Sequence, residues 1–219
     1  MKHLPHKTIG RLSQYRRALL LCLADEKTHI FSHEIAKIQH ITAAQVRRDI
    51  MLIGYTGTIR MGYNIQELID LIGSIIDSEE VINVCAVGMG RLGKSIVNYF
   101  NGKRTRLSMS ACFDNDRLKI GTDFKGIEIY DVKDLKKIVK EKNIKIGIIT
   151  VTAVNAVEVC EQLVKAKVKG ILNYAPKRVN VPKSIFLEEI DMITSLEKVA
   201  FYVKTHDDEQ FPVFAKWVT

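Results

Sequence analysis

Residues 81–93, Val-Ile-Asn-Val-Cys-Ala-Val-Gly-Met-Gly-Arg-Leu-Gly, decide the fold of this chain. An apolar, β-branched run breaks here into the pattern Gly-x-Gly-x-x-Gly, and residues 94–100 have the composition of a helix. In such a strand–turn–helix unit Gly88 makes the tight turn, Gly90 lets the backbone approach a pyrophosphate, and Gly93 lets helix and strand pack closely. The phosphates would lie at the helix N-terminus, whose N–H groups favour an anion.

The dinucleotide fingerprint also requires an acidic residue about 20 positions further on, at the end of the next strand. Residues 107–113 form a second apolar run, and Asp114 follows it directly. A carboxylate there would bind both hydroxyls of the adenosine ribose and repel a 2′-phosphate, although the nearby Arg117 could soften that repulsion. The sequence therefore predicts NADH and NAD+ as cofactors, bound by Gly88, Met89, Gly90, Arg91, Leu92, Gly93 and Asp114.

Strand-like and helix-like segments alternate from residue 81 onward, which is typical of a parallel sheet covered by helices on both faces. We expect strands at 81–87, 107–113, 127–130, 144–151 and 170–173, and helices at 91–100, 132–142 and 153–166. Ligands bind at the carboxyl ends of the strands in such a Rossmann fold. Two of the loops at those ends are therefore predicted to lie beside the nicotinamide, and they contribute Thr150, Val151, Thr152, Asn173 and Tyr174.

The first 63 residues are basic, with ten Lys or Arg residues against four Asp or Glu residues, in a chain of net charge +8. Such a segment favours an anionic partner, although a solvated basic surface would have the same composition. Apolar residues at helical spacing predict helices at 9–24, 33–39 and 43–53. Ser32 and Thr42 stand where the second and third of these helices need N-caps.

The second and third of these helices, joined by a tight turn, match the helix-turn-helix pattern. The third helix turns Val46 inward and presents Gln45, Arg47 and Arg48 on its polar side. Arg47 and Arg48 cannot both face bases on one helical turn, so we expect one to read a base edge and the other to bind a phosphate. The sequence leaves open which arginine has which role.

A glycine-rich, aromatic segment follows at 54–63, and it predicts a β-hairpin that forms the wing of a winged helix. Arg60 at the tip of this wing could enter a minor groove. A further amphipathic helix is expected at 64–76, and the acidic residues 77–80 form a linker. The fold class is therefore α/β, with a winged helix-turn-helix DNA-binding domain at 1–80 and a Rossmann NAD(H)-binding domain at 81–186.

The remaining residues, 187–219, are expected to form a helix at 187–204 and a tail. Such a terminal apolar helix closes its own core or is exchanged with a partner chain. The four cysteines lie far apart without a Cys-x-x-Cys pair, which favours core residues in a reducing compartment over disulfides or a metal site. Without an apolar segment typical of a signal peptide or membrane span, we expect a cytoplasmic protein with no membrane association.

The order of these motifs resembles that of Rex, a family of bacterial redox-sensing transcriptional repressors. The matching segments lie within about residues 8–204 and occur at 45–49, 62–64, 87–93, 113–116, 170–176 and 191. The resemblance implies a homodimer that exchanges its C-terminal helices. It also implies that the dimer binds double-stranded operator DNA when NADH is low and releases it when NADH binds.

The resemblance also assigns roles to single residues. It implies that Arg17, Tyr99 and Asp191 link the DNA-binding domain, the cofactor pocket and the partner's helix. The expected DNA contacts are Arg11, Gln45, Arg47, Arg48, Tyr55, Thr58 and Arg60.

The chain departs from the family pattern in three places. The recognition helix ends in Arg-Asp-Ile-Met-Leu-Ile-Gly at 48–54, where the family usually has Lys-Asp-Leu-Ser-Tyr-Phe-Gly. Arg60 stands one position late in the wing, and Thr152 replaces the proline of a Thr-Val-Pro loop.

Two other classes of function remain open from the residues alone. The first is an NAD-dependent oxidoreductase, but residues 81–205 contain no histidine, the commonest proton-transfer residue in catalysis, and we identify no catalytic residue. The second is a module that holds NAD(H) structurally and binds a protein partner. That second class would leave the basic helix-turn-helix unexplained, and a DNA-binding measurement would separate it from a repressor.

Overall fold

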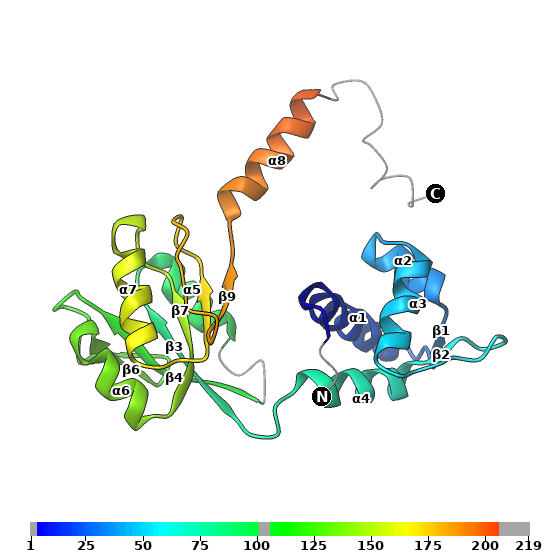
Figure 1. Cartoon of the computed structure of the whole chain (residues 1–219), viewed down its shortest axis with the longest axis horizontal. Helices are drawn as coiled ribbons and strands as arrows, with labels where there is room; N and C mark the ends of the chain where they lie inside the picture. The colour runs from blue at the N-terminus through cyan, green and yellow to red at the C-terminus, as the bar shows by residue number, and fades with distance from the viewer. Residues whose placement is uncertain (1–3, 101–105, 206–219) are drawn as a thin grey trace. The chain divides into compact units, whose positions relative to one another are not determined.

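The computed structural model describes residues 4–100 and 106–205. The chain divides into two compact units, one of which contains the residues up to Asp77 and the other Ser78–Val203 (Figure 1). Within the described ranges no helix is both long enough and apolar enough to span a membrane.

The N-terminal unit packs four helices around one apolar core. Its elements are α1 (His6–Ala24), β1 (His29–Ile30), α2 (Ser32–Gln39), α3 (Ala43–Leu52), β2 (Tyr63–Asn64) and α4 (Ile65–Ile76). Leu12, Leu19 and Ile50 are fully buried in this core, together with Ile65 and Leu68 of α4. The two short strands pair antiparallel, His29 with Asn64 and Ile30 with Tyr63.

Local capping explains where α3 begins and where α2 differs from prediction. The predicted Thr42 cap of α3 is confirmed, because the Thr42 side chain accepts a hydrogen bond from the Gln45 N–H at 3.2 Å. The predicted Ser32 cap is wrong, since α2 already includes Ser32. The Glu34 carboxylate instead accepts a hydrogen bond from the Phe31 N–H at 2.8 Å, which satisfies a donor at the start of α2.

The wing is more compact than the hairpin predicted over 54–63. Its only strand-like pairing among the described residues is a bridge in which Thr58 and Gly62 exchange two backbone hydrogen bonds of 2.8 Å. Tyr63 then leaves the hairpin and pairs with β1. Glycines at 54, 57 and 62 provide no side chains for a longer ladder, and Gly62 has a positive φ of 76°. The wing is therefore a short closed loop with Arg60 at its tip.

The second unit contains the predicted parallel sheet. Its strands are β3 (Ile82–Val87), β4 (Leu107–Asp114), β5 (Asp123–Phe124), β6 (Ile127–Asp131), β7 (Ile144–Ile149), β8 (Gly170–Asn173) and β9 (Phe186–Glu189). The strand order is β5-β6-β4-β3-β7-β8-β9, and every neighbouring pair is parallel except β5 with β6. The helices are α5 (Arg91–Phe100), a 3-10 turn η1 (Val132–Asp134), α6 (Leu135–Glu141), α7 (Ala153–Lys165) and α8 (Met192–Thr205).

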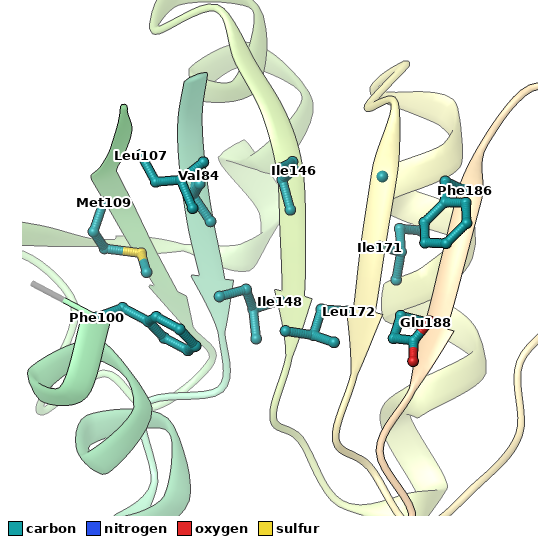
Figure 2. A pocket seen from close by; sticks show the side chains of 11 residues that line it. Val84, Phe100, Leu107, Met109, Ile146, Ile148, Ile171, Leu172, Phe186 and Glu188 are labelled. Carbon is teal, nitrogen blue, oxygen red and sulfur yellow. The ribbon is translucent and has the colours of Figure 1, made fainter. Parts of the chain in front are cut away.

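The two faces of this sheet are covered unequally. Successive residues of a strand point to opposite faces, and in β3 Cys85 packs in the cluster formed with α6 and α7, whereas Val84 packs with Ile96 of α5. On the α5 face an apolar groove of about 240 Å³ opens beside Phe100 and extends toward Phe186 of β9 (Figure 2). Side chains from five strands line this groove. Within the part of the chain that the structure describes, this region of the sheet face therefore has no covering helix of its own (Figure 2).

The helix predicted over 187–204 is wrong at its start. Residues 186–189 form β9, which pairs parallel to β8, with Phe186 opposite Gly170 and Glu189 opposite Asn173. α8 begins only at Met192, and all of its side chains from 192 to 204 are exposed. The short Phe-Leu-Glu-Glu segment becomes a strand because the edge of β8 offers backbone hydrogen bonds, which no local periodicity reveals.

Candidate functional site

The glycine turn at the end of β3 is built as its spacing predicts. Gly88 has φ 101°, and a Cβ atom on it would lie 2.8 Å from Val151 Cγ1. A Cβ on Gly93 would lie 1.9 Å from the carbonyl oxygen of Gly88, so only glycine lets α5 approach the turn. At Gly90, in contrast, an added Cβ meets no heavy atom within 4 Å. The turn and packing roles of Gly88 and Gly93 are confirmed, and Gly90 borders open space.

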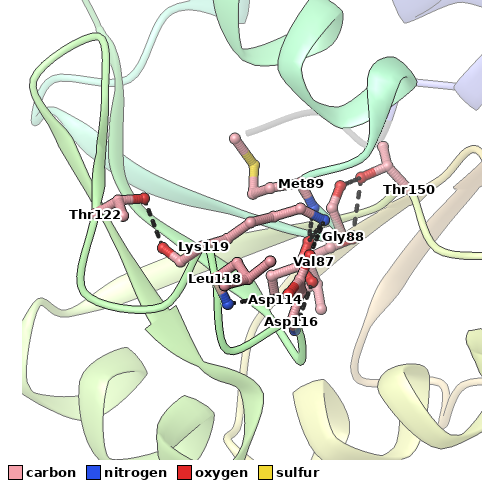
Figure 3. Close-up of polar contacts among 9 residues, drawn as sticks. All are labelled: Val87, Gly88, Met89, Asp114, Asp116, Leu118, Lys119, Thr122 and Thr150. Atoms are coloured by element: carbon pink, nitrogen blue, oxygen red, sulfur yellow. Dashed lines mark hydrogen bonds and ion pairs between the residues drawn. The ribbon is translucent and has the colours of Figure 1, made fainter.

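Thr150 holds this turn from the neighbouring strand. Its N–H donates to the Val87 carbonyl at 2.9 Å, and its hydroxyl donates toward the Gly88 and Val87 carbonyls at 2.8 and 3.0 Å (Figure 3). Val151 packs on Gly88, and Thr152 is the exposed residue immediately before α7. The Thr150 side chain thus acts within the protein, as a brace between β7 and the glycine turn.

Asp114 lies at the carboxyl end of β4, beside the turn, with only 7% of its surface exposed. Its Oδ2 accepts a hydrogen bond from the Met89 N–H at 2.7 Å, and its Oδ1 accepts one from the Asp116 N–H at 2.9 Å (Figure 3). Burial alone would raise the pKa of Asp114, but these hydrogen bonds and the Lys119 ammonium, 3.1 Å away, lower it below the ordinary value. The carboxylate is therefore ionised at neutral pH.

The residues present at this edge fit a dinucleotide. A cavity of about 110 Å³ is lined by Gly88, Asp114, Asn115 and Val151, among others. The open space at Gly90 lies where α5 begins, and backbone N–H groups at a helix N-terminus bind phosphate. An ionised carboxylate at the end of the next strand suits the two ribose hydroxyls. The ligand itself would supply the nicotinamide, a ring that can be oxidised or reduced.

Asn173 and Tyr174, which follow each other at the end of β8, have different roles at this edge of the sheet. The buried Asn173 amide donates to the Lys177 carbonyl at 2.8 Å, and its oxygen accepts the Ala175 N–H at 3.0 Å. Asn173 therefore fixes the loop that follows β8. Tyr174 is half-buried, and burial together with the nearby Tyr99 raises its pKa. Of the two, Tyr174 is the one whose side chain is partly open to a ligand.

A buried aspartate on α3 was not predicted from the sequence. Asp49 is fully buried, and Arg11 of α1 binds both of its oxygens, at 2.6 and 2.7 Å. The Tyr15 hydroxyl donates to Asp49 at 2.8 Å, and the Gln45 amide donates at 3.0 Å. A sequence signal was present: Asp49 follows Val46 by three positions, on the apolar stripe, where a charge requires partners. Of the two predicted DNA contacts in this cluster, Arg11 joins α1 to α3, and Gln45 binds Asp49 within α3.

The other predicted DNA contacts lie on the surface of the N-terminal unit. Arg47 and Arg48 are exposed on α3, and the Arg47 guanidinium donates to the Ser32 hydroxyl at 3.2 Å. The Tyr55 hydroxyl donates to Glu67 of α4 at 2.7 Å, and burial and that contact raise the pKa of Tyr55 to about 12.

At the tip of the wing, the Thr58 hydroxyl accepts the Met61 N–H at 3.1 Å and stabilises the closed loop. Arg60 is exposed there, beside the almost fully exposed Ile59. The N-terminal unit therefore presents cations from both α3 and the wing.

The three residues proposed to carry the signal are all exposed. Arg17 lies on α1 in the N-terminal unit, whereas Tyr99 of α5 and Asp191 belong to the second unit. Tyr99 makes an edge contact with Phe100, at 5.3 Å between ring centroids. Asp191 caps α8, because its carboxylate accepts the Thr194 N–H at 2.9 Å and the Thr194 hydroxyl at 2.6 Å. These hydrogen bonds lower the pKa of Asp191, so it is ionised.

Comparisons with known families and proteins follow the same division into two units. A family described as "Putative DNA-binding protein N-terminus" matches residues 3–50, and one described as "CoA binding domain" matches residues 79–177. The chain is 37% identical to the redox-sensing transcriptional repressor Rex of Carboxydothermus hydrogenoformans, over 92% of this chain and 97% of that protein. It is 33% identical to the repressor Rex of Limosilactobacillus reuteri, over 95% and 97%.

Two solved structures of RSP, a Rex-family repressor, are also similar, both at 27% sequence identity. RSP in complex with β-NAD+ and operator DNA has a TM-score of 0.85 and covers 95% of both chains. RSP in complex with β-NADH has a TM-score of 0.83 and covers 95% of this chain and 97% of that one. The similarity therefore extends over both units of the chain.

Proposed function

The chain belongs to the Rex family of redox-sensing transcriptional repressors, and we propose that it binds operator DNA as a homodimer and releases it when NADH binds. The observation that carries this proposal is the ionised Asp114 beside the glycine turn, in the same chain as an exposed, basic recognition helix. One unit can thus report the NADH/NAD+ ratio while the other binds DNA. The relatives are named as repressors, which disfavours an oxidoreductase.

The DNA contacts divide by role. Arg47, Arg48 and Arg60 are exposed cations, and we assign base reading or phosphate binding to them. Tyr55 and Thr58 shape the wing through their own hydrogen bonds, and we assign contacts with the backbone of the duplex to them. Because operator DNA is part of the bacterial chromosome, the protein acts in the cytoplasm.

Arg11 and Gln45 support DNA binding through Asp49. Their side chains point to a fully buried carboxylate, so neither contributes a side chain free of intramolecular contact to the DNA surface. Arg11 of α1 sets the position of α3 by binding Asp49, while Gln45, which lies on α3 itself, satisfies the same carboxylate from within the helix. Since a recognition helix must present its side chains to base edges in a defined register, this placement favours specific binding.

The cofactor contacts follow from the same edge of the sheet. The backbone N–H groups of Gly90, Arg91 and Leu92 would hold the pyrophosphate, and Asp114, which accepts the Met89 N–H, would hold the adenosine ribose. We place Val151, Thr152 and Tyr174 at the nicotinamide end, where β7 and β8 finish, with Gly88, Gly93, Thr150 and Asn173 fixing the loops.

The homodimer is inferred from two apolar surfaces of the second unit. On α8, Leu196, Val199 and Val203 form a stripe at helical spacing, and each is more than half exposed. The groove beside Phe100 is likewise apolar, and no helix among the described residues covers it (Figure 2). Exposed surfaces of this kind mark interfaces, and we infer that a second copy of the chain covers them by exchanging α8.

Release of DNA by NADH is tested with a duplex selected by this protein from a random library. We expect NADH to weaken binding of that duplex by about tenfold or more, a typical allosteric coupling, whereas NAD+ leaves it nearly unchanged. Fluorescence anisotropy of the labelled duplex measures both affinities. Equal affinity in the presence of NADH and NAD+ would overturn the redox-sensing role.

The dimer is tested by sedimentation of the full-length Leu196→Asp variant, since a carboxylate on the apolar stripe opposes burial of α8. We expect this variant to dissociate into monomers. Lys198→Asp changes a polar position of the same helix outside the apolar stripe and is the control, which should remain dimeric. A Leu196→Asp variant that sediments like the wild type would contradict the exchange of α8.

A further inference from the structure

The ribose-binding carboxylate has a cation of its own. Lys119 Nζ lies 3.1 Å from Asp114 Oδ2 and 3.4 Å from Asp116 Oδ2 (Figure 3). The sequence pointed to Arg117 as the cation that could soften the repulsion of a 2′-phosphate, yet the ion pair forms with Lys119. Its ammonium group therefore lies at the edge of the site that would receive the adenosine ribose.

The backbone holds Lys119 in this place. Its N–H donates to the Asp116 carbonyl at 2.9 Å, and its carbonyl accepts the Thr122 hydroxyl at 2.6 Å and the Thr122 N–H at 3.1 Å. Thr122 is itself tied to β6, because its carbonyl accepts the Ile129 N–H at 2.9 Å. The loop is thus closed on both sides of the lysine. With 30% of its side chain exposed, Lys119 still faces the solvent from which a ligand arrives.

The ion pair with Lys119 reduces the negative charge of the site. Asp114 and Asp116 carry two negative charges, and Lys119 carries one positive charge, so the cluster has a net charge of −1 instead of −2. A 2′-phosphate on the ribose would meet both the repelling carboxylate and an ammonium donor beside it. Coulomb attraction at a partly solvated separation of about 4 Å corresponds to roughly a tenfold change in affinity.

We propose that Lys119 is a specificity-determining residue that limits how strongly the site rejects NADPH in favour of NADH. Asp114 selects the unmodified ribose by accepting hydrogen bonds from its hydroxyls. Lys119 stabilises the negative charge of a 2′-phosphate at the same edge. This role rests on the proposed function, because it presumes that the glycine turn and Asp114 bind a nicotinamide dinucleotide. Asp114 and Lys119 would therefore have opposite effects on the preference for NADH over NADPH.

The test measures NADH and NADPH affinities of the full-length protein by titration calorimetry. In Lys119→Met we expect NADPH binding to weaken about tenfold more than NADH binding, so that the preference for NADH rises. Lys119→Arg keeps the charge and should keep the wild-type preference. Lys145→Met removes an exposed lysine at the opposite end of the sheet, near the start of β7, and controls for the change in net charge.

The outcomes separate the two proposals. Wild-type protein that binds neither dinucleotide would overturn the proposed function and, with it, the role of Lys119. If NADH binds and Lys119→Met weakens both dinucleotides equally, Lys119 is only structural and the specificity proposal fails. A loss confined to NADH would also overturn it, because Lys119 would then act only by positioning Asp114. Thermal melting of each variant identifies a loss of fold, which would equally mark Lys119 as structural.

Discussion

Among the described residues, each unit of this molecule contains one buried aspartate with a cationic partner, and the two have different roles. Asp49 in the N-terminal unit is enclosed by side chains from α1 and α3, and none of its surface is exposed. Asp114 in the Rossmann unit is held mainly by backbone N–H groups and borders a cavity. The difference indicates that Asp49 joins two helices, whereas Asp114 is held ready for a ligand. A buried acid is thus a ligand site only where it faces open space.

The largest expected effect comes from Asp49→Ala. Removing one partner of a buried ion pair leaves Arg11 without its counter-charge, which typically costs about 3–5 kcal/mol. We expect hydrogen–deuterium exchange to accelerate in α1 and α3, while β3 and β4 keep their protection. Since the chain has two units, local exchange is a better measure than one global unfolding curve.

Two further variants sharpen this contrast. Asp70→Ala removes an exposed acid of α4 and should change stability by no more than about 0.5 kcal/mol. Asp114→Ala should destabilise its unit less than Asp49→Ala does the other, because water can enter the adjoining cavity and satisfy the Met89 and Asp116 N–H groups. Equal losses for Asp49 and Asp114 would contradict the distinction between a structural and a ligand-facing acid.

Tyr15 provides the next largest effect and makes the N-terminal unit sensitive to alkali. Burial and the hydrogen bond to Asp49 raise the pKa of Tyr15 well above its ordinary value of about 10. Because the folded-state pKa is raised, the stabilisation by the protonated hydroxyl is complete below about pH 10 and is lost as the pH rises toward the folded-state pKa. Tyr15→Phe should cost about 1.5–3 kcal/mol at neutral pH, since a hydrogen bond to a charged group is lost.

Urea denaturation at about pH 8 and about pH 11 measures how the free energy of unfolding of the N-terminal unit changes with pH. The wild type should lose stability between the two conditions, and Tyr15→Phe should lose less. Tyr55→Phe should reduce this loss as well, because burial and the hydrogen bond to Glu67 raise the pKa of Tyr55 to about 12. A pH dependence that is the same in wild type and Tyr15→Phe would show that another group titrates.

The two glycines of the turn should separate stability from ligand binding. Gly93→Ala places a methyl group against the Gly88 carbonyl, and such overpacking costs about 1–3 kcal/mol. Gly90→Ala adds the same group in open space, so melting should not change while NADH affinity falls, because the methyl group occupies the pyrophosphate site. Thermal melting and NADH titration give the melting temperature and the NADH affinity of each variant. Destabilisation by Gly90→Ala would contradict the open geometry there.

The features that the sequence predicted are those with local causes. The Thr42 cap, the glycine turn and the extent of α5 are fixed by residues within one or two turns of chain, and each is confirmed. The family resemblance, which rests on several such local motifs in the right order, is confirmed by the 37% identity with a Rex repressor over 92% of the chain. The assignments of DNA contacts and of the signalling residues stay predictions.

The features that the sequence missed depend on residues far apart in the chain. Arg11 and Asp49 are 38 positions apart, and only packing of α1 on α3 brings them together. β9 forms because the segment at Phe186 pairs with the edge of β8, opposite Gly170. The apolar spacing of α8 continues into this segment, and that spacing alone predicts a helix. Lys119 faces Asp114 because a turn tied to β6 folds it back, and no spacing rule of the fingerprint includes it.

The smallest expected effect concerns communication between the two units, and Asp191 is the residue through which we test it. Asp191 also caps α8, because its carboxylate accepts hydrogen bonds from Thr194. Asp191→Ala would remove both the charge and the cap, so a change in its behaviour could come from fraying of α8. Asp191→Asn removes the charge but keeps an oxygen that can accept the Thr194 N–H, because asparagine is as good an N-cap as aspartate.

We therefore expect Asp191→Asn to bind NADH and selected DNA separately with nearly wild-type affinity. What should fall is the factor by which NADH weakens DNA binding and, by linkage, the equal factor by which DNA weakens NADH binding. Measuring both factors in both proteins tests the reciprocity as well as the residue, since unequal factors within one protein would indicate a second process. If the factor in Asp191→Asn equals that of the wild type while Asp191→Ala alone reduces it, the cap on α8, and not the charge of Asp191, transmits the signal.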